Sequence, residues 1–500
     1  MRVLLITGKL AESRIREIAQ KFQCSVYAAS TEVASLIKPK TLAGALKEEM
    51  LHGIDLILAP GLITGNLAVV EKTTGLKTYR GTRDIADLEH VLKNLSRVKL
   101  SRDVPADVLL DGELRRKAYV ELEKVNTSRY IKSKLKIPDN FLIRDLPVGT
   151  AFPIRVVAEI VDAGNLADED VERRAEYYIR EGADIIDIGM NEKNPERVGE
   201  LINLLRPLDV PLSIDTMEAG NIQSALDDGI DLVLSFDHDL LMKFSGVSTP
   251  CVIIPKKGNI PSSPEERLRL MEENMELARR RGFKNPIADL VLHPANLGLV
   301  DSLTAYKRYT DEHDAPVLMG IGNVTELMDA DSPGINALLC AAAMECRASL
   351  LFTTEAGDKT AGSVRELSTA VKMMYISARR KSVPANLGID LLISKEKKIK
   401  RDALDKNAIM NIKKIKAASK KTVYMDEKGY FKIFVDEKIN CIHYYKNTPH
   451  LSIEGNNAKE ICDTIHNLGL ISDLDHALYL GRELTKAEEA LIYRRSYQQS

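Results

Sequence analysis

Two short apolar segments of this 500-residue chain each end in an aspartate, and their pattern is the clearest sign of chemistry in the sequence. The first reads GADIIDIGMN and contains Asp187, and the second reads VPLSIDTMEAG and contains Asp215. An apolar, β-branched run that ends in a carboxylate and leads into a helix is typical of parallel sheets and barrels, whose enzymes build their sites at the C-terminal strand ends. We therefore expect Asp187 and Asp215 to lie at neighbouring strand ends.

Strand-like and helix-like segments alternate between residues 150 and 385, and these elements would position the two aspartates. The span is close to the usual size of a (β/α)8 barrel, so the pattern favours a closed TIM barrel over an open doubly wound sheet. The expected strands cover residues 153–161, 183–189, 210–215, 230–236, 249–255, 288–294, 315–322 and 349–355.

A barrel of this kind would bring the polar residues at its strand ends together at one mouth. A carboxylate there can accept two parallel N–H bonds, which suits a guanidine-like edge such as that of a 2-amino-4-oxo pteridine. The polar residues at the expected strand ends are Glu159 and Asp162, Asp187 with Asn191, Asp215, Ser235 with Asp237, Lys256 and Lys257, His293 with Asn296, Asn323, and Thr354 with Glu355.

The second and third of these strands resemble those of the dihydropteroate synthases and related pterin-binding barrels. GADIIDIGMNEKNP is similar to their second-strand motif, and LSIDT is similar to their third-strand motif. The resemblance covers about half the chain. It implies that Asp215 binds the pterin ring, with Asp187 as a supporting residue and Ser235 or Asp237 as a further contact. It also places Glu159 near the diphosphate and its Mg²⁺, for which a carboxylate is a good ligand.

The later strands depart from the synthase pattern. His293-Pro294 stands where the synthases usually have an aspartate before proline, and their seventh-strand Ser-Arg-Lys is replaced by the segment 320–324, GIGNV. Their eighth-strand Arg-x-His is replaced by the segment 353–355, TTE. An ordinary p-aminobenzoate site is therefore not expected. GIGNV is closer to the pterin-dependent methyltransferases, which implies a pterin contact for Asn323. His293 stays open as a proton carrier, a metal ligand or a hydrogen-bonded replacement for aspartate.

The whole layout resembles the archaeal dihydropteroate synthase-like proteins. It comprises an α/β doubly wound domain (1–135), the pterin-binding barrel (150–385) and a small α+β domain (390–500). The resemblance implies transfer of a 7,8-dihydropterin-6-methyl group from its diphosphate to an arylamine, ribofuranosylaminobenzene phosphate, in tetrahydromethanopterin biosynthesis. A homodimer is also implied.

Three roles at the mouth follow for such a reaction. Asp215 and Asn323 would hold and polarise the pterin ring, and Glu159 would hold Mg²⁺. The phosphate groups need cations, and loops after the last barrel strands commonly bind phosphate at a helix N-terminus. The candidate phosphate ligands are Lys256, Lys257 and Lys359.

Two other functions stay open. One is methyl transfer from a methyl-tetrahydropterin to a corrinoid, which Asn323 favours. The other is a non-catalytic pterin-binding subunit, which the missing Lys and Arg-x-His favour. A corrinoid enzyme would be expected to carry partner-binding or iron–sulfur cysteine motifs, and the sequence shows none.

The composition of the chain argues against nucleic acid and membranes as binding partners. The 70 basic and 72 acidic side chains give a formal net charge of −2, which provides no overall field for nucleic acid or an anionic membrane. No apolar run reaches the roughly 18 residues of a spanning helix. The six cysteines are scattered, as expected of core thiols in a reducing cytosol.

The terminal regions carry weaker signals. Strands are expected at 2–7, 25–29 and 55–61, and the loop 60–66 is expected to be a plain turn, because it lacks the glycine pattern of a phosphate cradle. The basic stretch 395–421 is expected to be a solvated helical face. Residues 422–445 are expected to form a three-strand meander turning at 427–429 and 437–438, followed by two helices that act as a cover or an oligomer interface.

Overall fold

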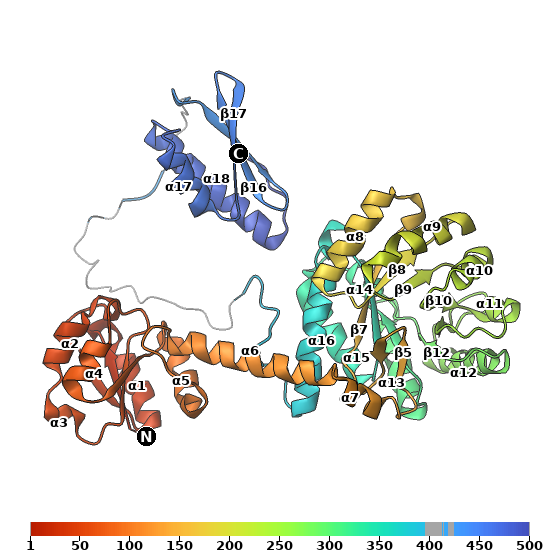
Figure 1. The fold of residues 1–500 in the computed structure, drawn as a ribbon, viewed down its shortest axis with the longest axis horizontal. Helices are drawn as coiled ribbons and strands as arrows, with labels where there is room; N and C mark the ends of the chain where they lie inside the picture. Colours follow the sequence, from red (N-terminus) through yellow and green to blue (C-terminus); the bar gives the residue numbers. More distant parts are fainter. Residues whose placement is uncertain (1, 396–412, 414, 419–424, 500) are drawn as a thin grey trace. The chain divides into compact units, whose positions relative to one another are not determined.

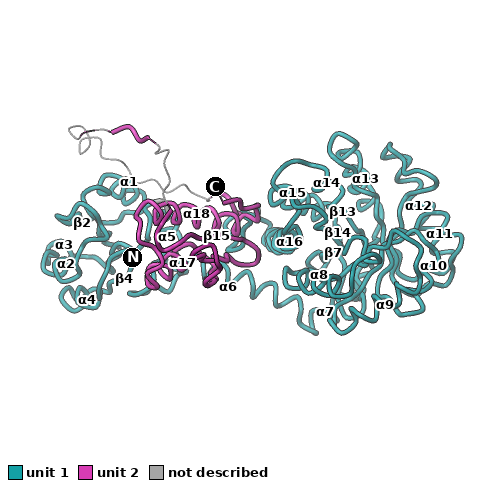
Figure 2. The backbone as a smooth tube through the Cα atoms, turned by 90° about the horizontal axis from the view of Figure 1, so that it is seen from above, with its two compact units in different colours: residues 1–391 teal, residues 392–500 magenta. Residues whose placement is uncertain are grey.

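A computed structural model describes residues 2–395, 413, 415–418 and 425–499 of the chain. These residues divide into two compact units, 1–391 and 392–500 (Figure 2). The helical face expected within 395–421 falls mostly outside the described residues. Among the helices that the structure describes, none is long and apolar enough to cross a membrane. The division into three domains stays a prediction.

The first unit begins with a four-stranded parallel sheet, the head sheet, in the order β2-β1-β3-β4. Alternate apolar residues of β1 and β3 point to opposite faces, so α1 and α5 pack on one face and α2 and α4 on the other. The doubly wound arrangement is confirmed, but it has a fourth strand that the sequence did not suggest. The elements are β1 (Val3–Thr7), α1 (Glu12–Phe22), β2 (Ser25–Ala28), α2 (Pro39–Ala45), α3 (Glu48–Leu51), β3 (Leu56–Ala59), α4 (Ala68–Thr74), β4 (Lys77–Arg80) and α5 (Ile85–Lys93).

Two helices and a hairpin lead from the head sheet to the barrel (Figure 1). On the long helix α6, Arg116 and Lys117 are exposed and both pair with Glu113. The hairpin contributes Ile143 and Val148 to an apolar cluster with inward residues of the barrel strands, and so fills one end of the barrel. The elements are α6 (Ala106–Val125), α7 (Ser128–Lys134), β5 (Phe141–Ile143) and β6 (Leu146–Val148).

Eight parallel strands in the order β12-β11-β10-β9-β8-β7-β14-β13 form the barrel. A parallel bridge between Ala288 and Val317 joins the two outer strands and closes it. The (β/α)8 architecture is therefore confirmed. The strands are β7 (Arg155–Ile160), β8 (Ile185–Gly189), β9 (Leu212–Asp215), β10 (Leu232–Phe236), β11 (Cys251–Ile253), β12 (Pro286–Ala288), β13 (Leu318–Gly320) and β14 (Leu350–Thr354).

Helices surround the barrel strands and bury their outward residues in one large apolar core (Figure 1). They are α8 (Asp168–Glu181), α9 (Pro195–Leu205), α10 (Ala219–Asp227), α11 (His238–Lys243), α12 (Pro264–Arg280), α13 (Leu299–Glu312), α14 (Gly322–Thr325), α15 (Ser332–Glu345) and α16 (Ser363–Arg380). Short 3-10 turns include Ala163–Asn165 after β7 and Asp358–Thr360 after β14.

One barrel strand lies elsewhere than expected. The apolar run 288–294 was expected to be the sixth strand, whereas β12 is Pro286–Ala288 and the run itself leaves the sheet. Val291 has a φ of +61°, a backbone conformation that is rare for a β-branched residue. An apolar run thus forms a buried turn at the mouth of the barrel.

The second unit is a three-stranded antiparallel sheet with two helices packed on it. The expected meander is present, but its strands are shifted along the chain. The stretch before residue 427 contributes no strand among its described residues, and the third strand follows Tyr445. The elements are β15 (Tyr430–Val435), β16 (Ile439–Tyr445), β17 (Thr448–Gly455), α17 (Ala458–Asn467) and α18 (Leu474–Tyr493).

Candidate active site

Three carboxylates lie on three adjacent strands at the C-terminal end of the barrel. In the β7–β8 ladder Glu159 pairs with Asp187, and in the β8–β9 ladder Gly189 pairs with Asp215. The expectation that Asp187 and Asp215 occupy neighbouring strands therefore agrees with the structure. We call Glu159, Asp187 and Asp215 the acid cluster.

Gly189 lets the Glu159 side chain extend across the strand end. A Cβ atom at position 189 would lie 2.4 Å from Glu159 Oε1 and 3.1 Å from the Ile160 carbonyl oxygen. The Glu159 carboxylate therefore rests directly over Gly189, beside the strand that carries Asp215. A side chain at position 189 would push this carboxylate away.

Burial and mutual repulsion favour the neutral forms of the acid cluster. Burial raises the pKa of Asp187 well above its usual range, Asp215 and Glu159 raise it further, and the Ser213 hydroxyl, which donates to Asp187 Oδ1, lowers it. Burial likewise raises the pKa of Asp215, against a hydrogen bond from Ser235. Burial, then Asp215 and Glu326, raise the pKa of Glu159 to about 8.

One oxygen of the cluster stands out. Asp187 is fully buried, and its Oδ2 atom has no hydrogen-bond partner among the described residues. A buried carboxylate oxygen without a donor costs free energy of folding, typically about 1–3 kcal/mol. A ligand that donates N–H groups or positive charge here would recover that cost.

Asp289 joins the site, although its sequence position did not suggest it. It follows β12, accepts hydrogen bonds from the Tyr306 hydroxyl and from Val291 N, and is close enough to Asp215 for repulsion. Burial raises its pKa to about 6, which the Tyr306 hydrogen bond opposes. The expected strand 288–294 placed Asp289 inside a strand, so only the observed end of β12 brings it to the mouth.

His293 is a hydrogen-bonded structural group in this arrangement. Its Nε2 lies 3.0 Å from Arg267 Nη2, which can only donate, and its Nδ1 lies 3.1 Å from the Leu297 carbonyl oxygen, which can only accept. Both contacts are satisfied by the neutral ring with hydrogen on Nδ1. Burial and the nearby Arg267 lower the pKa of His293, in keeping with that form.

Arg267, which the sequence did not single out, organises this part of the mouth. Its side chain is fully buried, and its guanidinium donates to the carbonyl oxygens of Pro261, Leu290 and Val291 at 2.8–3.3 Å. It therefore ties the loop after β11 to the turn after β12 and holds Val291 in its strained conformation.

The fourth and fifth strand ends provide a helix cap and an ion pair. Ser235 has a φ of +66° and reaches Asp215. Asp237 caps α11 by accepting from Leu240 N at 2.9 Å, and its Oδ2 lies 3.8 Å from Lys256 Nζ. Lys257 is exposed on the turn that follows. Ser235 thus faces the acid cluster, while Asp237 and Lys256 pair with each other.

Asn323 lies in the short helix α14 after β13, and Glu326 directly follows that helix. Asn323 is exposed, and its Nδ2 donates to the Leu292 carbonyl oxygen at 3.0 Å. Glu326 lies three residues further on and is close enough to Glu159 to raise its pKa. Its Oε1 is buried without a hydrogen-bond partner among the described residues.

The loop after β14 holds Lys359 near Glu326. Lys359 Nζ donates to the exposed Asp329 at 2.9 Å and also lowers the pKa of Glu326, which burial raises. Glu355 accepts from Val364 N at 3.0 Å in the first turn of α16 and from the Tyr177 hydroxyl. The Glu355 carboxylate therefore accepts from a backbone N–H of α16 that was expected to bind phosphate. Lys359 is the remaining candidate phosphate ligand in this loop.

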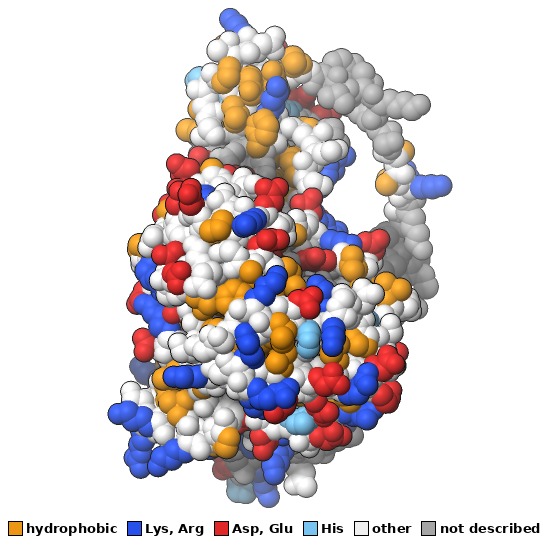
Figure 3. Space-filling model, turned by 90° about the vertical axis from the view of Figure 1, so that its right-hand side faces the viewer, with side chains coloured by type: hydrophobic (Ala, Val, Ile, Leu, Met, Phe, Trp, Pro, Cys, Tyr) orange, Lys and Arg blue, Asp and Glu red, His pale blue; other side chains and the backbone are white. Residues whose placement is uncertain are grey.

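Three further expected residues lie on loops that follow barrel strands. Asp162 accepts from its neighbour Asn165, and Asn191 and Asn296 are exposed. Basic and acidic side chains are interspersed on the face shown in Figure 3, as the balanced composition suggested.

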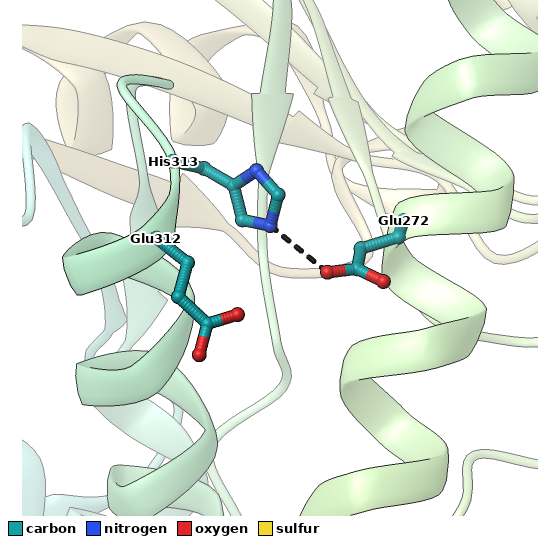
Figure 4. A group of neighbouring side chains, drawn as sticks. All are labelled: Glu272, Glu312 and His313. Atoms are coloured by element: carbon teal, nitrogen blue, oxygen red, sulfur yellow. Dashed lines mark hydrogen bonds and ion pairs between the residues drawn. The ribbon is translucent and has the colours of Figure 1, made fainter.

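A further group of metal-ligand type lies on the barrel's outer surface. Glu272, Glu312 and His313 bring their ligand atoms within 4.8 Å of one another, and among the described residues they are the one set of three His, Cys, Asp or Glu side chains that does so (Figure 4). His313 Nε2 lies 3.0 Å from Glu272 Oε1. The group is largely exposed, and Glu312 and His313 come shortly before the start of β13, whereas the mouth residues follow the strand ends, so it does not belong to the mouth.

The residues at the mouth fit Mg²⁺ chemically. Mg²⁺ binds oxygen ligands, usually one or two carboxylates together with water and substrate phosphate. The acid cluster supplies carboxylates, and Asp187 Oδ2 is a buried oxygen with no donor among the described residues. Glu159, with its displaced pKa, is the member that a cation would stabilise in its charged form.

Comparisons with known proteins agree with this geometry. Residues 161–330 match the family described as "Pterin binding enzyme", and residues 425–500 match the family described as "PterinBD-DUF4346". An uncharacterized protein of Methanocaldococcus jannaschii is 35% identical over 524 aligned positions, which cover 100% of this chain and 98% of that protein. A dihydropteroate synthase of Clostridium beijerinckii is 24% identical over 188 residues, 32% of this chain and 68% of the synthase.

Solved structures of dihydropteroate synthases also align with the chain. The enzyme of Xanthomonas albilineans with 4-aminobenzoic acid has a TM-score of 0.39 at 18% identity and covers 49% of this chain and 100% of its own. That of Coxiella burnetii with pteroic acid has a TM-score of 0.38 at 18% identity and covers 49% and 98%.

The strand order defines a (β/α)8 barrel protein, and its acidic candidate site lies at the C-terminal strand ends. With the full-length relative and the matching families, the chain belongs to the dihydropteroate synthase-like, pterin-binding proteins.

Proposed function

We propose that the protein transfers a 7,8-dihydropterin-6-methyl group from its diphosphate ester to an arylamine. The C–O bond to the diphosphate breaks, a C–N bond to the amine forms, and the amine gives up one proton as diphosphate leaves. An arylamine is neutral at pH 7, so the reaction needs positioning and charge stabilisation more than a strong base.

The observation that carries this proposal is the acid cluster beside the unpartnered Asp187 Oδ2. A pterin presents a 2-amino group and a ring N–H side by side, and a carboxylate can accept both. Asp215, at the end of β9, would bind this edge, while the buried Asp187 supports it from the neighbouring strand. Asp289, from the turn after β12, and Asn323 would meet other edges of the ring.

The charges at the mouth support an acceptor other than p-aminobenzoate. Glu326 and Glu355 follow the seventh and eighth strands, where a benzoate carboxylate would need cations. A ribofuranosylaminobenzene phosphate offers hydroxyl donors to carboxylates, and its phosphate suits Lys256, Lys257 or Lys359 at the rim. When bound, Mg²⁺ would neutralise charge on the diphosphate leaving group.

The test is a direct assay. Purified protein is given dihydropterin methyl diphosphate with Mg²⁺ and either p-aminobenzoate or the ribofuranosyl amine phosphate, and diphosphate release and the coupled product are measured. Turnover with the ribofuranosyl amine is expected. No diphosphate release with either amine would contradict the proposal.

Asn323 supports one other function, transfer of a methyl group from a methyl-tetrahydropterin to a corrinoid. With a methyl-tetrahydropterin as the methyl donor, the visible spectrum of added cob(I)alamin would then change to that of methylcobalamin, and the pterin would be left demethylated. We expect no change, because the mouth is lined with carboxylates suited to a cation.

A further inference from the structure

Glu326 is held against the barrel strands at the same place as Thr354. A Cβ atom at Gly322 would lie 3.4 Å from Glu326 Oε1 and 3.5 Å from Thr354 Cγ2, so both side chains lie beside this glycine. In the β14–β7 ladder Thr354 pairs with Glu159. Thr354 and Glu159 therefore lie on the adjacent strands β14 and β7, and Glu326 reaches the same place from the segment that follows β13 and α14.

Two oxygens in this row lack hydrogen-bond partners among the described residues. They are Glu326 Oε1 and Thr354 Oγ1. Thr354 is buried, with only 6% of its surface exposed. Lys359, the nearest cation that acts on Glu326, donates instead to Asp329. Two carboxylates that repel each other and a buried hydroxyl thus belong to neighbouring strands and loops in this part of the mouth.

We propose that Glu326, together with Glu159 and the Thr354 hydroxyl, binds a divalent cation of the Mg²⁺ class at the barrel mouth. All three groups are hard oxygen ligands, and two carboxylates are the usual protein share of a Mg²⁺ site that is completed by water and phosphate. This proposal deepens the proposed function and rests on it, because the ion's role would be to bind the diphosphate leaving group. A diphosphate bound to the ion would also come within reach of Lys359.

The test measures binding of Mn²⁺, a spectroscopic substitute for Mg²⁺. The full chain carries Glu272→Gln and His313→Ala, which remove the surface group of Figure 4. Loss of the electron paramagnetic resonance signal of free Mn²⁺ gives the affinity, with Mn²⁺ alone and with added inorganic diphosphate. We expect one site, and affinity at least about tenfold weaker in Glu326→Gln and in Glu159→Gln.

Asp331→Asn is the matched control, because Asp331 is an exposed carboxylate five residues after Glu326. It should leave the affinity unchanged. A folded Glu326→Gln variant that binds Mn²⁺ as tightly as its parent would overturn the proposal. If that variant fails to fold, Gly189→Ala decides, because its methyl group displaces the Glu159 carboxylate. Unchanged affinity in Gly189→Ala would then overturn it.

The two proposals can fail separately. If Mn²⁺ binding depends on Glu326 but no amine gives turnover with pterin diphosphate, the proposed cation site stands and the proposed function fails. Turnover with a Glu326→Gln variant of unchanged Mn²⁺ affinity would leave the function and remove Glu326 from the site.

Discussion

The head sheet and the barrel are both parallel sheets whose loops follow C-terminal strand ends, yet these ends differ in chemistry. In the head sheet, a Cβ atom at Gly8 would lie 2.5 Å from the Glu32 carbonyl oxygen, and one at Gly61 would lie 2.5 Å from backbone atoms of Thr82 and Arg83. Arg80 donates to the Gly61 carbonyl oxygen at 3.1 Å and also to that of Ile63. Backbone atoms of the chain itself therefore fill the space beside Gly8 and Gly61.

The barrel mouth has the opposite character. Asp187, Glu326 and Thr354 each keep a buried oxygen without a partner among the described residues, and several carboxylates sit close together. Such an arrangement costs folding free energy, and proteins keep it where a ligand or reaction needs it. A parallel strand end by itself does not make a site, and the barrel mouth differs from the head sheet in its close group of buried carboxylates.

The largest effect is expected from Asp215→Asn. An amide presents one acceptor and a donor, so it cannot accept both N–H groups of a pterin edge, and we expect pterin affinity to fall about 100-fold or more. Titration of intrinsic pterin fluorescence measures it. Asp227→Asn, on the exposed side of α10, is the control and should bind normally. If Asp215→Asn and Asp227→Asn bound pterin with equal affinity, the barrel mouth would no longer differ from the head sheet in ligand binding.

Asp289 gives the mouth a pH-dependent contribution to stability. Its pKa of about 6, raised from 3.8 by burial, means that the unfolded chain loses this proton first as pH rises. Its contribution should therefore lower the free energy of unfolding between about pH 4 and pH 6, by about 3 kcal/mol, and stay constant above. Urea unfolding across this range measures it.

The comparison for that experiment is Asp289→Asn, which keeps an acceptor for Tyr306. The difference in unfolding free energy between parent and variant should change over pH 4–6, which separates Asp289 from other titrating groups. A difference that stays flat would show that Asp289 titrates normally.

Gly61→Ala should damage the head sheet and leave the mouth intact. The added methyl group would meet backbone atoms that cannot rotate away, and we expect a loss of about 1–3 kcal/mol in unfolding free energy with unchanged pterin affinity. Gly44→Ala is the control, because nothing lies within 4 Å of its Cβ position in helix α2. Weaker pterin binding in Gly61→Ala would mean that the head loop takes part in the site.

The smallest effect is expected from Asp187→Asn, and this variant should be more stable than the parent protein. An amide keeps the acceptor for Ser213 and removes a buried ionisable group, so thermal unfolding should show a gain of about 1–2 kcal/mol at neutral pH. Pterin binding should weaken at the same time. A loss of stability would indicate that Asp187 is already compensated by contacts within the chain.

Much of the barrel could be predicted because its strands are apolar runs between recognisable helices. The sixth strand could not be placed, since the run 288–294 has the composition of a buried strand and nothing local ends it. The turn at Val291 exists because Arg267, more than twenty residues earlier, donates to its carbonyl oxygen at 2.9 Å. Because the strand was misplaced, Asp289 was not predicted to lie at the mouth. Glu326 was not predicted either, because it follows the short helix α14, three residues after Asn323, and does not directly follow a strand.

The sequence by itself determined the (β/α)8 barrel and the strand ends that carry Asp187 and Asp215, because alternation of apolar runs and helices is a local property of the chain. The tertiary structure alone decided which polar groups are buried together and which keep a partner. Closing the barrel sets Glu159, Thr354 and Glu326 side by side from distant segments, and it also gives His293 its partner in Arg267. Hydrogen-bond satisfaction and charge repulsion depend on such neighbours in space, and no local pattern contains them.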